Sequence, residues 1–119
     1  MSTQQIASRL AALVGKGEFE AAQRELFAED AVSIEPRASE HFSKETRGLP
    51  AILDKGRKWG AMVEEVHSCA ASAPLVAGNA IALSLTMEVT MKGGGRMQLA
   101  EICVYQVKDG KIVAEQFFM

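Results

Sequence analysis

The chain has little of several residue types that define common classes of protein. Its 119 residues include only two cysteines, three prolines, one tryptophan and one tyrosine. The two cysteines, Cys69 and Cys103, form no CxxC pair and make no disulfide framework, so we expect a reducing, cytoplasmic location. No apolar run approaches the roughly 18 residues of a membrane span, and Met1–Leu10 is too polar for a secretion signal. These absences predict a soluble intracellular protein.

Neither sign of charge is in excess. The formal net charge of −2 argues against binding to nucleic acid or to an anionic membrane. A run of cations at Arg47, Lys55, Arg57 and Lys58 is typical of a solvated helix face. The two histidines lack metal-ligand spacing, and Gly93–Gly95 is predicted to be a hairpin tip rather than a phosphate cradle. We therefore expect no metal and no cofactor.

Apolar periodicity places helices first and strands afterwards. Spacing of three and four predicts three helices, and alternation predicts five strands with tight turns between the last three. The helices are expected over Thr3–Val14, Glu18–Phe27 and from Leu49, and the strands over Ala31–Glu35, Glu65–Ala73, Ala80–Met91, Met97–Val107 and Ile112–Phe118. The segment Arg37–Gly48 is predicted to be a loop. This order favours a single α+β domain over residues 1–119, in which three helices pack on a curved, mostly antiparallel sheet that forms a cone with one pocket.

Three segments resemble a known family. Phe27–Ala31, followed by a short strand and Pro36, is similar to the Y/F-A-x-D-A segment of the nuclear transport factor 2-like superfamily, which includes ketosteroid isomerase and the SnoaL-like cyclases. Gly48–Ile52 resembles its G-x-x-A-I segment, and Val107–Ile112 its closing V/F-x-D-G-K-I hairpin. The resemblance spans nearly the whole chain and implies the cystatin-like α+β roll of that group.

The resemblance also implies positions for catalytic groups. The carboxylate of ketosteroid isomerase ends the first strand directly before a proline, which here is Glu35. The position of its second acid falls on Cys103, and Glu101 lies one strand step earlier on the same face. The position of its tyrosine falls near Leu10, so the only tyrosine, Tyr105, is the candidate hydrogen-bond donor. A carboxyl group beside an apolar cavity has a raised pKa and can move a proton next to a carbonyl.

Several further residues are candidates for the pocket, each with a plainer interpretation. Trp59, with Phe117 or Phe118, could form an aromatic wall or simply pack in the core. His67 could shuttle a proton near neutral pH or be a structural strand residue. Two remaining strand acids are expected on solvated faces: Glu88 and Glu115.

Two classes of function stay open. One is a cofactor-free isomerase, cyclase or lyase that moves a proton beside a carbonyl, with Glu35 or Glu101 as the base. The other is a module that binds a small apolar molecule without turnover, or a dimeric accessory protein. The polar alternation of Ser84, Thr86, Glu88 and Thr90 suits an open sheet face that is solvated or pairs two copies, and family resemblance implies a homodimer.

Overall fold

The computed structural model describes residues 1–119 as three helices and seven strands. The helices are α1 (Thr3–Gly15), α2 (Phe19–Leu26) and α3 (Leu49–Met62). The strands are β1 (Phe27–Ile34), β2 (Glu45–Arg47), β3 (Val63–Ala71), β4 (Leu75–Ala77), β5 (Ala80–Met91), β6 (Arg96–Lys108) and β7 (Lys111–Phe118). No helix has the length and apolar character needed to cross a bilayer.

Local chemistry fixes where the helices begin. Before α1, the Ser2 hydroxyl accepts a hydrogen bond from the Gln5 amide, and the Gln5 side chain accepts one from the Ser2 amide. This capping box satisfies amides that have no partner inside the helix. At α3, Gly48 has a φ of 92°, which only glycine adopts readily, and Pro50 occupies the first turn. The predicted helices are confirmed, with ends that differ by about one residue.

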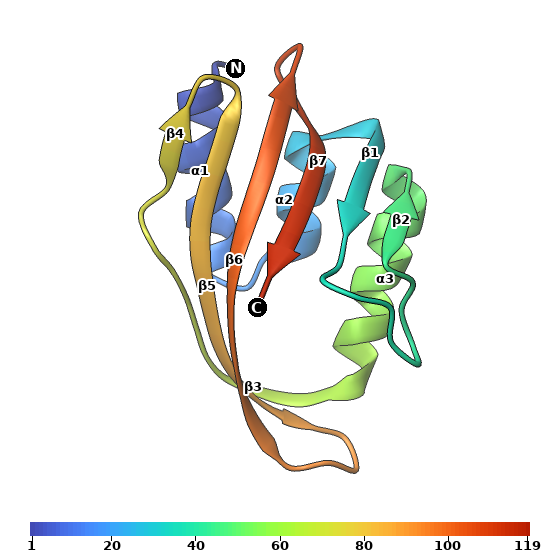
Figure 1. Ribbon diagram of the computed structural model, residues 1–119. Coiled ribbons are helices and arrows are strands. Elements are labelled where there is room, and N and C mark those ends of the chain that lie inside the picture. Colours follow the sequence, from blue (N-terminus) through green and yellow to red (C-terminus); the bar gives the residue numbers. More distant parts are fainter.

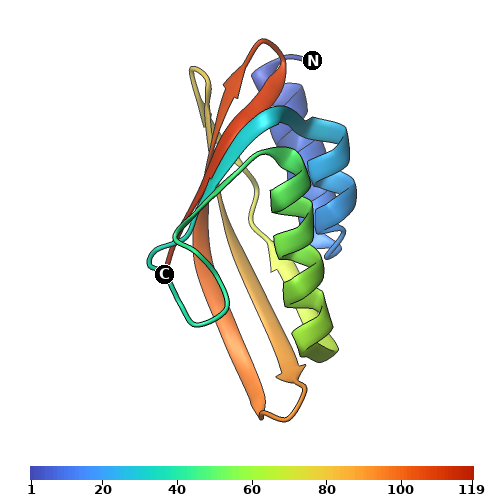
Figure 2. The same cartoon turned by 90° about the vertical axis from the view of Figure 1, so that its right-hand side faces the viewer.

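One sheet carries the fold, and all three helices cover one of its faces (Figures 1 and 2). Its strand order is β2-β1-β7-β6-β5-β3, with β4 paired to β5. The predicted β5-β6-β7 meander is confirmed as antiparallel, whereas β1 pairs with β7 in parallel. The side chains of β5 alternate between buried and more exposed, and the buried ones belong to the same hydrophobic core as the buried side chains of the helices: Ile81, Leu83, Leu85, Met87 and Val89. The face beneath the helices is therefore the concave, interior face.

Three boundaries differ from the prediction. The strand expected at Ala31 begins at Phe27, directly after α2, because a register shift separates the Phe27 and Val32 pairs and hides the alternation. Part of the expected loop forms β2, an edge strand paired with β1. Pro74 separates β3 from β4, in accord with the missing amide of proline. These changes leave the α+β architecture as predicted.

Candidate functional site

A β-bulge in β7 decides which of its side chains enter the cone. Val107 pairs with Ile112, but the next residue back on β6, Gln106, pairs with Ala114, so Val113 is left without a partner. A bulge of this kind shifts the inward and outward alternation by one residue. Glu115 consequently lies directly opposite Tyr105 on the interior face.

Glu115 is the most deeply buried acid of the chain. Its side chain stands between Tyr105 on one neighbouring strand and Ser33 on the other, and only 4% of the residue is exposed. Burial raises the pKa of Glu115 to about 7, against the opposing effects of a hydrogen bond from Ser33 and the charge of Lys55. At neutral pH this carboxyl group is therefore poised between its two protonation states.

Lys55 brings a single cation to this group of side chains. Its Nζ donates to Ser33 Oγ at 2.6 Å and to Glu35 Oε2 at 2.9 Å, and it lies 5.6 Å from the centre of the Phe117 ring. Helix α3 is preceded by its N-cap residue Gly48, whose amide donates to the Ala31 carbonyl on β1, and this contact sets the start of the helix beside that strand. The result is a chain of hydrogen bonds from Glu35 through Lys55 to Ser33, and Ser33 is the register partner of Glu115.

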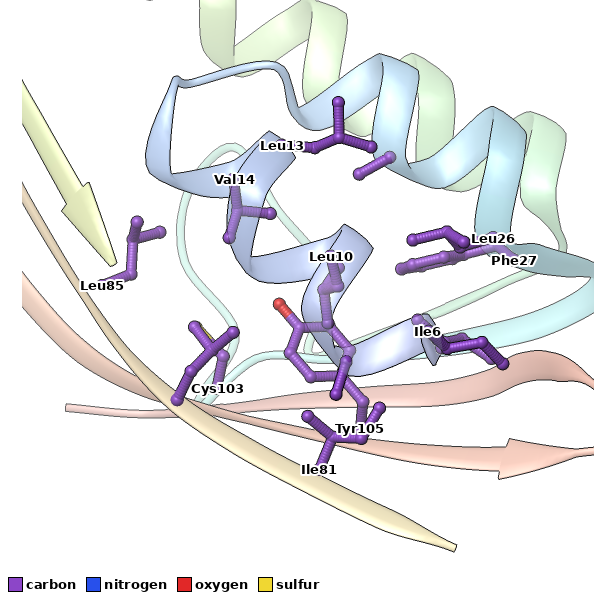
Figure 3. Packing of buried hydrophobic residues seen from close by; sticks show 14 of the residues in the cluster. Ile6, Leu10, Leu13, Val14, Leu26, Phe27, Ile81, Leu85, Cys103 and Tyr105 are labelled. Atoms are coloured by element: carbon purple, nitrogen blue, oxygen red, sulfur yellow. The ribbon is translucent and has the colours of Figure 1, made fainter. Parts of the chain in front are cut away.

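Glu101 and Cys103 lie further along β6 on the same face. The Cys103 thiol donates to Glu101 Oε1 at a distance of 3.7 Å, and Glu101 itself is half-buried. Burial, and then the charge of Glu35, raises the pKa of Glu101. Burial likewise raises the pKa values of Cys103 and Tyr105, so both keep their protons at neutral pH. Tyr105 and Cys103 project from the sheet toward α1 (Figure 3).

The structure brings together five of the residues singled out in the sequence, although they come from three strands. Around Lys55 and Glu115 lie Glu35, Glu101, Cys103, Tyr105 and Phe117. The set holds three carboxyl groups that influence one another's charge, two protonated weak acids and one ammonium group. Chemically, this arrangement can hold, donate or accept a proton in surroundings that exclude most water.

Three other candidates lie elsewhere. His67, on β3, binds Glu65 Oε2 at 2.7 Å and Thr90 Oγ1 at 2.6 Å on the opposite side of the sheet. Phe118 follows Phe117 in the strand, so it points to that outer face and is 48% exposed. Trp59 lies one helical turn beyond Lys55 and is half-buried, on the stretch of α3 that leads to the open end of the cone.

The expectation that Glu115 is solvated is wrong, and Ser33 and Lys55 also join the site unforeseen. Strict alternation through the Lys108–Lys111 turn would put Ala114 opposite Tyr105 and leave Glu115 outside. Ile112 and Val113 are consecutive apolar residues at the start of β7. They interrupt the alternation of a regular strand, which is the sequence signal of the bulge.

Two surface hollows are lined by residues outside this cluster. One, of about 300 Å³, lies between α2 and α3 and is lined by both signs of charge, including Arg24, Arg57 and Asp54. The other, of about 510 Å³, lies at the open end of the cone between the end of α3, the end of β5 and the loop at His41.

A family model for the SnoaL-like domain matches residues 1–119. The chain belongs to the SnoaL-like domain family. A search of curated proteins found no match. Among solved structures, this SnoaL-like domain is similar to a protein of Mesorhizobium loti described as a SnoaL-like polyketide cyclase. The two are 32% identical over 100% of both chains, with a TM-score of 0.90.

More distant solved structures share the fold of this SnoaL-like domain. A Xanthomonas campestris protein of unknown function with a cystatin-like fold is 21% identical, with a TM-score of 0.81 over 99% of this chain and 90% of its own. A Bacillus subtilis protein described as an isomerase is 22% identical, with a TM-score of 0.74 over 98% and 88%. The predicted cystatin-like and ketosteroid isomerase-like architecture is thereby confirmed.

Proposed function

We propose that this SnoaL-like domain binds a small apolar carbonyl compound at the interior face and moves a proton beside the carbonyl, as isomerases, cyclases and lyases do. The observation that carries the proposal is Glu101. It is half-buried, forms no ion pair, and has a raised pKa because burial disfavours its charged form. A carboxylate with these properties is a stronger base than one in water.

The neighbours of Glu101 supply the remaining functions that such a reaction needs. Glu35 is already bonded to Lys55 at 2.9 Å, so Glu101 is the freer of the two predicted bases. Lys55 uses two of its three N–H groups on Ser33 and Glu35, and the third can stabilise negative charge developing on a carbonyl oxygen. The family match and the Mesorhizobium loti structure support a reaction of the cyclase kind.

The test is proton exchange on a simple ketone. We expect the protein to accelerate loss of the α-proton NMR signals of 2-tetralone in heavy water, and Glu101→Gln to reduce that rate by about 10²–10⁴-fold. The matched control is Glu88→Gln, because Glu88 pairs with Arg96 and faces away from the site. Equal rates for Glu101→Gln and the natural chain would refute the assigned base.

Binding of the ligand at the same interior face without turnover is the competing function. If 2-tetralone binds and its α-protons exchange no faster than in buffer, the domain is a ligand-binding module. We further propose a cytoplasmic location, which the two free thiols of Cys69 and Cys103 support.

A further inference from the structure

The hollow at the open end of the cone combines an apolar floor with two cations. It is lined by His41, Lys58, Ala61, Met62, Met91 and Lys92, and its volume of about 510 Å³ lies in the range of small-molecule sites. Met91 packs against the buried core, so the floor of the hollow continues the interior face of β5. Methionine side chains adapt to ligands of irregular shape.

Both lysines carry unneutralised charge, and contacts fix the side chain of Lys58 and the backbone of Lys92. The Lys58 ammonium donates to the His41 carbonyl at 3.0 Å and lies 5.6 Å from the centre of the Phe42 ring. The Lys92 amide donates to the Met62 carbonyl at 2.9 Å, which ties the end of β5 to the end of α3. Neither ammonium group forms an ion pair with a carboxylate.

The charge balance sets this hollow apart from the one between α2 and α3. There the arginines are paired with carboxylates: Arg24 and Arg57 both bind Glu20, and Arg57 also lies 3.7 Å from Asp54. At the open end, no carboxylate lines the hollow, and the nearest acid on the loop, Glu40, is exposed and 3.8 Å from the His41 ring. A cavity with two unpaired cations over an apolar floor is complementary to an amphipathic anion.

We propose that this hollow binds the carboxylate end of a small organic acid with an apolar body, held by Lys58 and Lys92 and packed on Met62 and Met91. The inference rests on the proposed function, because it names the class of molecule that the domain takes up. Lys58 lies about 4.5 Å along the helix axis from Lys55, so α3 carries a cation both at this hollow and at the interior carboxyl groups.

The experiment compares two probes of nearly the same shape, the anion 2-naphthoate and the neutral amide 2-naphthamide. Spectra of protein labelled with ¹³C in the methionine methyl groups are recorded during titration with each. We expect 2-naphthoate to shift the Met62 and Met91 signals and to bind about tenfold more tightly than the amide, the gain of one charge-assisted hydrogen bond. Lys58→Gln and Lys92→Gln are each expected to remove most of that preference.

The control is Lys108→Gln, at the hairpin on the other end of β6, which is expected to leave both affinities unchanged. Equal affinity for the two probes, or 2-naphthoate binding that Lys58→Gln and Lys92→Gln leave intact, overturns the inference. This result can be told apart from that of the proposed reaction. The exchange rate of 2-tetralone depends on Glu101, whereas the preference for 2-naphthoate depends on Lys58 and Lys92, so either can be observed without the other.

Discussion

Ser33 lies between the side chains of Lys55 and Glu115, and its hydroxyl can donate one hydrogen bond. Its hydroxyl accepts from the Lys55 ammonium at 2.6 Å, and a hydrogen bond from it opposes the rise in the pKa of Glu115. Ser33 is fully buried, so it is not exposed to attack a ligand as a nucleophile. It instead links the polar side chains of strand β7 and helix α3. The protonation state of Glu115 is thereby coupled to the charge of Lys55.

Glu115 is expected to make stability fall as pH rises. Its pKa is about 7 in the folded protein and near 4.3 when unfolded. Between those values the folded state holds a proton that the unfolded state has lost, so the free energy of unfolding decreases with pH by up to about 4 kcal/mol and levels off above pH 7.

Urea unfolding at a series of pH values between 4 and 8 measures this effect. Glu115→Gln keeps the shape of the side chain and removes the proton, so its profile should be flatter than that of the natural chain. The raised pKa of Glu101 adds a slope of the same sign in both proteins. Parallel profiles for the two proteins would show that Glu115 is not the titrating group.

At the scale of elements, the junction between β2 and α3 positions the only cation of the interior cluster. Gly48 has a φ of 92° and donates to the Ala31 carbonyl at 2.7 Å. Gly48→Ala forces a side chain into a backbone conformation that costs about 1–3 kcal/mol. We expect that loss of stability in thermal or urea unfolding, together with weaker coupling of Lys55 to Ser33.

Gly60 is the matched control, because it lies in the same helix with open space around its α-carbon. Gly60→Ala should stabilise the protein by about 0.5 kcal/mol, since alanine loses less backbone freedom in a helix. Similar changes in stability for Gly48→Ala and Gly60→Ala would contradict the argument from backbone geometry.

The sequence predicts the helices and strands better than it predicts the contacts between them. Periodicity predicts the helices and the β5-β6-β7 meander because each depends on neighbours close in the chain. It does not show that β1 pairs with β7 in parallel, a contact across most of the chain. Glu101 and Tyr105 follow from one strand's alternation, whereas Ser33, Lys55 and Glu115 meet only through that pairing and the bulge at Val113.

At the scale of the whole molecule, the outer face of the sheet leaves apolar side chains in water. Ile102 and Phe118 are register partners on β6 and β7, and they are 47% and 48% exposed. No helix covers this face (Figure 2). An open sheet face of this kind can pair with the same face of a second copy around a two-fold axis, so we expect a homodimer.

Light scattering after size exclusion measures the mass of the natural chain and of Ile102→Lys. The charge at the centre of the outer face should shift the population to monomer, while Leu75→Lys should leave the mass unchanged. Leu75 is the control because it is 75% exposed on β4, away from β6 and β7. A monomeric natural chain at high concentration would exclude this mode of assembly.

The unpaired Val113 has a consequence for how this fold can vary over evolution. Loss of that one residue would remove the bulge and leave the pairs of Gln106 with Ala114 and of Tyr105 with Glu115 as they are. Strand β7 can therefore lose one residue while Glu115 keeps its place in the interior. A gap at this position in a related chain is then compatible with unchanged chemistry, whereas a gap between Glu115 and Phe117 would bring Phe118 inward.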